Sequence, residues 1–128
     1  MLSVTPIYAA LLTFLILLLS VRVSLVRRRL KISVGDANEP SLMKAIRTHS
    51  NGVENIPLGI ALLAILELQG PPDALVHLAG VALLVGRSLH AWGLGSNPQV
   101  VFARVYGAYI TLFSLFGLAV ANLILAIF

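Results

Sequence analysis

Four long apolar stretches are the feature that most restricts what this chain can fold into. They cover about residues 4–26, 44–68, 74–94 and 104–128. A helix needs about 20 consecutive apolar residues to cross the hydrocarbon core of a bilayer, and each stretch is long enough. Charged residues make up only 11% of the chain, whereas ordinary soluble domains contain about 25%. We therefore expect one all-α membrane domain over residues 1–128, built as a bundle of four transmembrane helices.

Basic residues predict how these helices are oriented. Six of them flank the first loop: Arg27, Arg28, Arg29, Lys31, Lys44 and Arg47. Arg104 flanks the third loop, whereas the second loop and both termini carry no Lys or Arg. Because cytoplasmic loops are enriched in Lys and Arg, we expect loops one and three in the cytoplasm and both termini outside. The stretch from Met1 to Val21 lacks the basic start of a signal peptide, so we expect a retained first membrane helix.

A polar stretch from Ile46 to Pro57 begins the second apolar segment. A mid-bilayer Arg or Asp costs about 2.5–3.5 kcal/mol, and each Leu or Ile contributes about 0.3–0.6 kcal/mol in the opposite direction. The eight Leu and Ile residues from Ile56 to Leu68 therefore offset roughly 2.4–4.8 kcal/mol, which matches one buried charge but not several. This stretch needs partners, which are other helices, a water-filled cavity or a polar ligand.

Three polar residues of this stretch share one helical face. Arg47, Asn51 and Glu54 are spaced i, i+4 and i+7, whereas His49 points to the other side. Arg binds carboxylates bidentately and Glu accepts an ammonium group, so the stripe suits a ligand that carries both groups. An intramembrane ion pair of Glu54 with an arginine, which only fixes helix packing, explains the same residues equally well.

Further candidates lie at the same predicted depth. Arg87 and His90 are spaced i, i+3 on the third helix, and Arg87 falls within the apolar span, where it must meet a partner. Glu54 is the nearest acidic residue in depth. Arg104, at the start of the fourth helix, and Arg22, near the end of the first, lie at the same level. We therefore include all four basic residues in the candidate site.

The remaining polar and small residues favour structural roles. Glycines on the third and fourth helices, such as Gly93 and Gly107, let helices approach closely in lipid. Glu67 falls at the outer edge, and Tyr106 and Tyr109 suit an interfacial aromatic belt. The chain has no Cys and no paired His, so we expect no metal. Because the net charge of +4 is concentrated beside an apolar segment, it favours membrane lipids over nucleic acid as partners.

The order and spacing of these motifs resemble the MAPEG family, the membrane-associated proteins in eicosanoid and glutathione metabolism, and above all its short bacterial members. The most specific match is the second-helix motif, Arg47-x-His49-x-Asn51-x-x-Glu54-x-x-Pro57. Supporting matches cover most of the chain: Gly35-Asp36, Glu67-Leu68-x-Gly70, Gly86-Arg87-x-x-His90-Ala91-x-Gly93-Leu94 and Arg104-Val105-x-Gly107.

The resemblance implies a homotrimer of four-helix protomers in the bacterial inner membrane, with glutathione bound as co-substrate between subunits toward the cytoplasmic face. The resemblance carries contact with glutathione over to Arg47, Asn51, Glu54 and Arg87. We add His90 and Arg22 as candidate glutathione contacts because they lie at the same predicted depth. Arg104 is the catalytic candidate, since an arginine near this junction stabilises the glutathione thiolate in the family. The implied activity is that of a glutathione transferase or peroxidase, with hydrophobic electrophiles or lipid hydroperoxides as substrates.

A non-catalytic protein is the alternative hypothesis. In that case the same polar stripe holds a trimer together or binds an anionic lipid or metabolite. The chain has Asn55, His90 and Leu94 where eukaryotic relatives often have tyrosines, and this favours the alternative. The nearly complete second-helix motif, together with Arg87 and Arg104, favours the enzyme.

Overall fold

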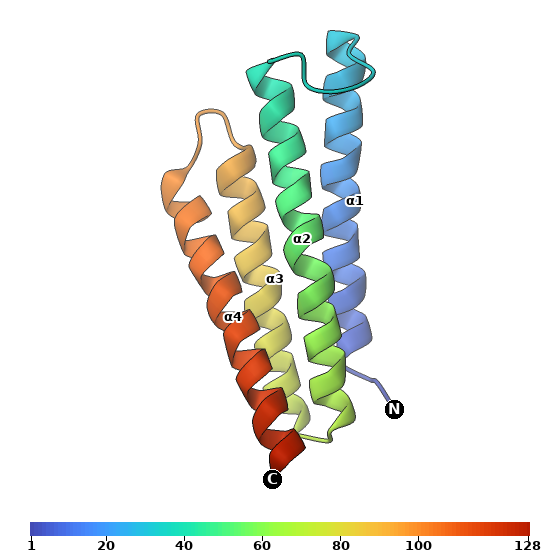
Figure 1. Cartoon of the computed structure of the whole chain (residues 1–128), viewed down its shortest axis with the longest axis vertical. Helices are drawn as coiled ribbons and strands as arrows, with labels where there is room; N and C mark the ends of the chain where they lie inside the picture. The colour runs from blue at the N-terminus through green and yellow to red at the C-terminus, as the bar shows by residue number, and fades with distance from the viewer.

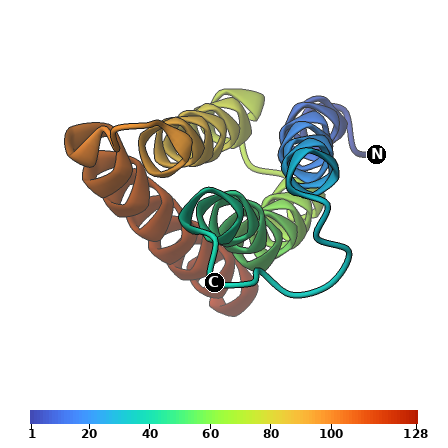
Figure 2. The ribbon, with the colours of Figure 1, turned by 90° about the horizontal axis from the view of Figure 1, so that it is seen from above.

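The computed structural model describes all 128 residues, and four helices account for most of them. They are α1 (Thr5–Leu30), α2 (Pro40–Leu68), α3 (Asp73–Gly95) and α4 (Val101–Ile127). The helices form one elongated up-and-down bundle (Figure 1). Seen from above, α1 and α4 lie on opposite sides, and α1 packs mainly against α2 and α3 (Figure 2). The all-α architecture agrees with the sequence prediction.

Three helices extend further than hydrophobicity alone predicted, and one of them is α4, which begins at Val101 rather than at Arg104. α1 continues beyond Val26, through three arginines, to Leu30, and α2 begins at Pro40 rather than at Lys44. Arginines in a last turn interact favourably with the helix dipole, and proline is well suited to a first helical position. Lys31 then ends α1 in the left-handed conformation, with φ of 57°. The ends were missed because capping, not hydrophobicity, determines them.

The closest approach between helices lies at glycines of α3 and α4. A Cβ atom on Gly93 would collide with the backbone of Arg104, and one on Gly107 would collide with the backbone of His90. Helices in lipid associate through close packing, because no hydrophobic force draws them together there. The expected packing role of these two glycines agrees with the structure, and it brings the backbones of α3 and α4 into contact beside Arg104.

Glu67 ties the beginning of α1 to the end of α2. Its carboxylate accepts hydrogen bonds from the backbone N–H groups of Val4 at 2.8 Å and Thr5 at 2.7 Å, and also from that of Ser3. Amide groups at a helix N-terminus have no partner within the helix. α1 has no side-chain cap of its own. The sequence predicts no more than an outer-edge position for Glu67, and the structure gives it a capping role.

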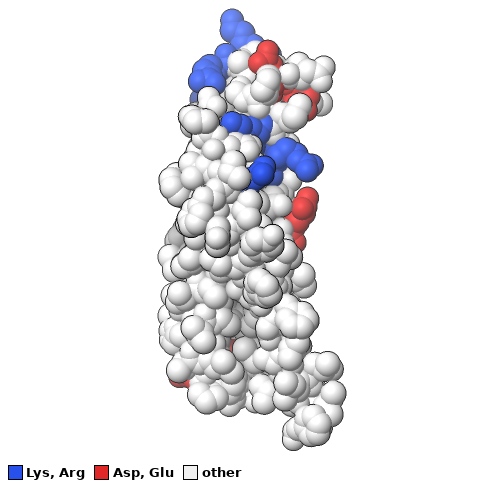
Figure 3. Space-filling view, turned by 90° about the vertical axis from the view of Figure 1, so that its left-hand side faces the viewer, with Lys and Arg blue, Asp and Glu red and all other residues white.

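All four helices are long and apolar enough to cross a membrane. Figure 3 shows Lys and Arg side chains gathered at the end of the molecule that carries the α1–α2 loop. This distribution agrees with the expectation that the basic residues lie toward one membrane face. Which face is cytoplasmic stays a prediction from the sequence.

We expect Gly107→Ala to destabilise the bundle, because the added Cβ atom would collide with backbone atoms of α3 that cannot rotate away. Overpacking of this kind costs about 1–3 kcal/mol. The midpoint of unfolding in dodecyl sulfate, followed by circular dichroism, should fall accordingly.

Gly117→Ala is the matched control on the same helix, since nothing lies within 4 Å of its added Cβ. This variant should be as stable as the wild-type protein, or up to about 1 kcal/mol more stable, because alanine has the higher helix propensity. Equal destabilisation by both substitutions would contradict the close approach of α3 and α4.

Candidate functional site

One large pocket opens at the end of the bundle that carries the basic residues. It has a volume of about 810 Å³ and is formed by α2, α3, α4 and the α3–α4 connection. Its polar lining residues are Lys44, Arg47, Ser50, Asn51, Glu54, His90, Gln99 and Arg104. Its other lining residues include Leu94 on α3 and Val105, Ala108, Tyr109 and Leu112 on α4. The pocket therefore combines a polar wall, mostly on α2, with a largely apolar wall on α4.

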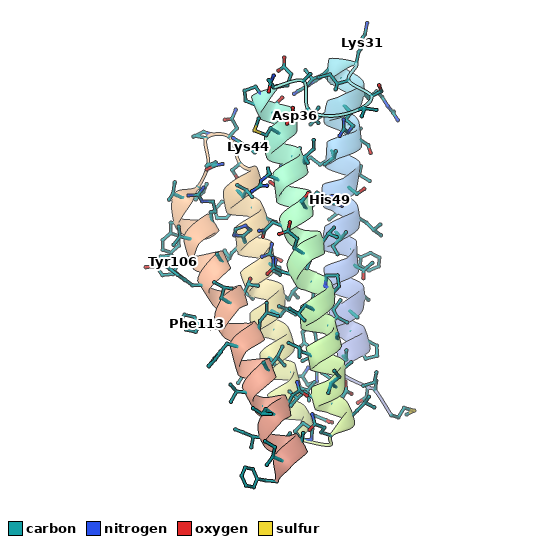
Figure 4. All side chains as sticks on the ribbon, viewed as in Figure 1. Lys31, Asp36, Lys44, His49, Tyr106 and Phe113 are labelled. Carbon is teal, nitrogen blue, oxygen red and sulfur yellow. The ribbon has the colours of Figure 1, made fainter.

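The predicted stripe of α2 lies on this polar wall. Arg47, Asn51 and Glu54 all line the pocket, as the helical period requires. Arg47 and Glu54 are exposed in the single protomer, so both charged groups are accessible to a ligand or to a neighbouring subunit. His49 is not part of the lining, and Figure 4 shows it on the side of α2 that faces α1. The separation of His49 from the stripe agrees with the sequence prediction.

Arg87 is buried behind this wall. Its side chain is only 2% exposed, and a terminal nitrogen donates a hydrogen bond to the side-chain oxygen of Asn51 at 2.6 Å. The sequence pointed to Glu54 as the partner of Arg87, whereas the structure assigns that role to the neutral amide. Arg87 does not line the pocket. It acts on the stripe by fixing the orientation of Asn51.

His90 and Arg104 meet where α3 and α4 approach each other. Nδ1 of His90 lies 3.0 Å from the backbone carbonyl oxygen of Arg104. The guanidinium of Arg104 lines the pocket and donates to the side-chain oxygen of Gln99 at 3.3 Å. The start of α4 thus presents a cation to the pocket, and contacts from α3 and from the α3–α4 connection hold it there.

Arg22 is the one predicted site residue that lies apart from this group. Its guanidinium donates a hydrogen bond to the backbone carbonyl of Gly95, at the end of α3. Carbonyl groups at a helix C-terminus have no partner within the helix. Within one protomer, Arg22 caps α3 from α1 and does not line the pocket.

Three lining residues with large polar side chains had no ligand role in the sequence interpretation. Lys44 lies one helical turn before Arg47, so the period of α2 was a signal that could have included it. Its ammonium group donates to the backbone carbonyl of Ser96 at 3.1 Å. Gln99 lies in the α3–α4 loop, where no helical period allows the direction of its side chain to be predicted.

Tyr109 is the third such residue, since the sequence placed it in the interfacial belt together with Tyr106. Tyr109 is 56% exposed and still contributes to the pocket wall. Tyr106 points away from the bundle (Figure 4). The belt interpretation therefore suits Tyr106 better than Tyr109.

The fold and the pocket define a class of protein, an integral membrane protein of four helices with a polar pocket at one end of the bundle. The MAPEG family model matches residues 5–124. The chain therefore belongs to the MAPEG family, as its motifs predicted.

Two bacterial relatives agree with this assignment. The chain is similar to the inner membrane protein YecN of Escherichia coli, in strain K12 and in a strain of serotype O6:H1. The identity is 37% over 90 residues, which cover 70% of this chain and 69% of YecN. Together with the four apolar helices, this similarity supports an integral inner-membrane protein. The resemblance to short bacterial members is confirmed.

We expect Asn51→Leu to destabilise the protein, because it leaves the buried guanidinium of Arg87 without its partner. Hydrogen bonds to charged groups contribute about 1.5–3 kcal/mol. The free energy of unfolding in detergent should fall by about this amount.

Asn55→Leu is the matched control, since the Asn55 amide donates only to the backbone oxygen of Asn51, at 2.9 Å on its own helix. This exchange should change the free energy of unfolding by less than about 1 kcal/mol. If Glu54→Gln lowers stability and Asn51→Leu does not, an ion pair with Glu54 is what stabilises Arg87.

Proposed function

We propose that this protein is a membrane-bound glutathione-dependent transferase or peroxidase that acts on hydrophobic substrates. The observation that carries the proposal is the pocket of about 810 Å³, in which Arg47, Asn51, Glu54 and Arg104 come together. Pockets for small molecules typically measure about 300–1,000 Å³, which suits a tripeptide. Membership of the MAPEG family, whose name refers to eicosanoid and glutathione metabolism, supports the same substrate.

The charges in the lining complement those of glutathione. Three lining residues, Lys44, Arg47 and Arg104, are cationic, and Glu54 is the single anion among them. Glutathione carries two carboxylates and one ammonium group, and ionisation of its thiol adds a further negative charge. Guanidinium groups bind carboxylates in a fork, and a carboxylate accepts the ammonium group. A cationic excess in the pocket stabilises the thiolate more than the thiol.

Arg104 is the group that activates the thiol. A free thiol has a pKa of about 8.5, and lowering it to about 6.5 requires roughly 2.7 kcal/mol of thiolate stabilisation. A guanidinium in a site of low dielectric constant can supply an interaction of that size. Arg104 suits this role because it lines the pocket and its one side-chain partner there is the neutral oxygen of Gln99.

The apolar wall on α4 supports a hydrophobic second substrate. Val105, Ala108 and Leu112 continue the pocket away from Arg104 along the helix. A substrate dissolved in the bilayer reaches the thiolate along this wall. The thiolate sulfur then attacks an electrophilic carbon, which forms a thioether and expels the leaving group with its electron pair. Alternatively it attacks the terminal oxygen of a hydroperoxide, which breaks the O–O bond, forms the sulfenic acid of glutathione and releases an alkoxide that is protonated to the alcohol. A second glutathione then reduces the sulfenic acid, giving glutathione disulfide and water.

A homotrimer completes the site in this proposal. Arg47 and Glu54 are exposed in the protomer, and charged side chains that face acyl chains are energetically costly. A neighbouring subunit that covers α2 removes these groups from lipid and closes the pocket around glutathione.

The exposure of Arg47 and Glu54 also supports a second candidate, a non-catalytic trimer. In it the two charged groups bind the neighbouring subunit, or an anionic lipid, and no chemistry follows. The two candidates differ in whether Glu54 is needed for assembly or for glutathione binding.

The proposed function is tested by titrating the purified protein in detergent with glutathione while thiolate absorbance is followed. We expect wild-type protein to bind glutathione as the thiolate near neutral pH, and Arg104→Ala to lose most of the thiolate signal while still binding glutathione. Arg28→Ala, an exposed arginine on α1, is the matched control and should leave the signal unchanged. Absence of a thiolate signal from wild-type protein at saturating glutathione would reject the enzymatic proposal.

Glu54→Gln separates the two candidates. Loss of its interaction with the ammonium group should raise the dissociation constant for glutathione about tenfold, with the oligomer unchanged in size-exclusion chromatography. Dissociation of the oligomer in this variant supports the non-catalytic trimer.

A further inference from the structure

His90 lies beside the pocket, and its hydrogen-bond partner is protein backbone. Only 8% of its surface is exposed. Its Nδ1 lies 3.0 Å from the carbonyl oxygen of Arg104. A carbonyl oxygen can only accept a hydrogen bond, so Nδ1 must carry the proton that is donated. The contact therefore fixes the tautomer of the ring.

The other ring nitrogen supports the neutral form. Nε2 of His90 is buried and has no hydrogen-bond partner. A doubly protonated ring would place a second N–H group in this position without an acceptor, which is costly in a buried site. With the proton on Nδ1, Nε2 holds only a lone pair. His90 is thus a neutral imidazole whose single N–H points at the backbone of α4.

The glycines of α3 and α4 make this contact possible. A Cβ atom on Gly107 would collide with the backbone of His90, and one on Gly93 would collide with the backbone of Arg104. The backbones of α3 and α4 are therefore in contact at two points, one at Gly93 and Arg104 and the other at His90 and Gly107. The backbone of Arg104 is held by Gly93 and His90 from α3, and its guanidinium is held by Gln99.

We propose that His90 is a positioning residue, which holds the backbone of Arg104 through Nδ1–H and thereby sets where the Arg104 guanidinium lies in the pocket. It acts through Arg104 and makes no contact with the bound thiol through Nε2. The consequence for thiol chemistry rests on the proposed function, in which Arg104 stabilises the thiolate. The tautomer and the backbone contact do not depend on that function.

Two substitutions separate the two ring nitrogens. The amide nitrogen of Asn occupies about the position of Nδ1 of His, and that of Gln occupies about the position of Nε2. His90→Asn therefore retains a donor for the carbonyl of Arg104, whereas His90→Gln loses it. The readout is the pKa of the glutathione thiol bound to each variant, measured by the pH dependence of thiolate absorbance.

We expect His90→Gln to raise the pKa of the bound thiol by about 0.5–1 unit, which lowers the ratio of thiolate to thiol at a given pH about threefold to tenfold. His90→Asn should leave that pKa unchanged. A residue that only supports the fold would alter stability in both variants without moving the thiol pKa in one alone. A raised pKa in His90→Asn, or an unchanged pKa in His90→Gln, would overturn the proposal.

A second measurement needs no glutathione. Protein labelled with ¹⁵N-histidine in detergent should show, for one of its three histidines, the nitrogen resonances of a neutral ring protonated at Nδ1. These resonances should vanish in His90→Asn, which assigns them. An Nε2-protonated or doubly protonated His90 would disprove the inference. If the expected tautomer is found while wild-type protein forms no thiolate, the proposed function fails and the contact between His90 and Arg104 stands.

Discussion

The close approach of α3 and α4 is the constraint on which the pocket depends. Inside a bilayer no hydrophobic force draws two apolar helices together, so they stay in contact through close packing and hydrogen bonds between them. Gly93 and Gly107 allow the close packing, and the contact of His90 with the Arg104 carbonyl provides a hydrogen bond between the two helices. The close packing and the hydrogen bond both lie near the start of α4. A wider separation at this point would move the Arg104 guanidinium relative to the stripe on α2.

Polar residues within the membrane are divided between two tasks. Some satisfy one another inside the protomer, as Arg87 and Asn51 do, or cap a helix end, as Arg22 does at Gly95. Others, above all Arg47 and Glu54, find no such partner and lie open in the pocket wall. The sequence predicted that placing the charged residues of the stretch from Ile46 to Pro57 in the bilayer is energetically costly. Contacts within the chain remove this cost only in part. In the proposed function, a ligand or a neighbouring subunit contacts the groups that remain open.

The depth of each site residue along the bundle axis could be predicted from the sequence. The side of the bundle on which each residue lies could be predicted only in part. Apolar length located the four helices, and the helical period placed Asn51 and Glu54 on one face. Arg22 and Arg104 share a depth, yet α1 and α4 lie on opposite sides of the bundle, so only Arg104 lines the pocket. The sequence did not reveal Asn51 as the partner of Arg87, because residue types alone favour an acidic residue over an amide as the partner of an arginine. Only the packing of α2 against α3 determines that the amide of Asn51, rather than the carboxylate of Glu54, lies at hydrogen-bond distance from Arg87.

The cap that Glu67 places on α1 has a consequence for the order of assembly. Membrane helices are synthesised and inserted from the N-terminus onward, so α1 enters the bilayer before the ribosome has made Glu67. During that interval the amide groups of Val4 and Thr5 must be hydrated by interfacial water or bound to lipid headgroups, since unsatisfied backbone groups are not tolerated in hydrocarbon. Arrival of the α2–α3 hairpin exchanges those temporary partners for a carboxylate. The N-terminal cap of α1 can therefore form only after α2 has been synthesised, because it depends on a residue more than sixty positions downstream.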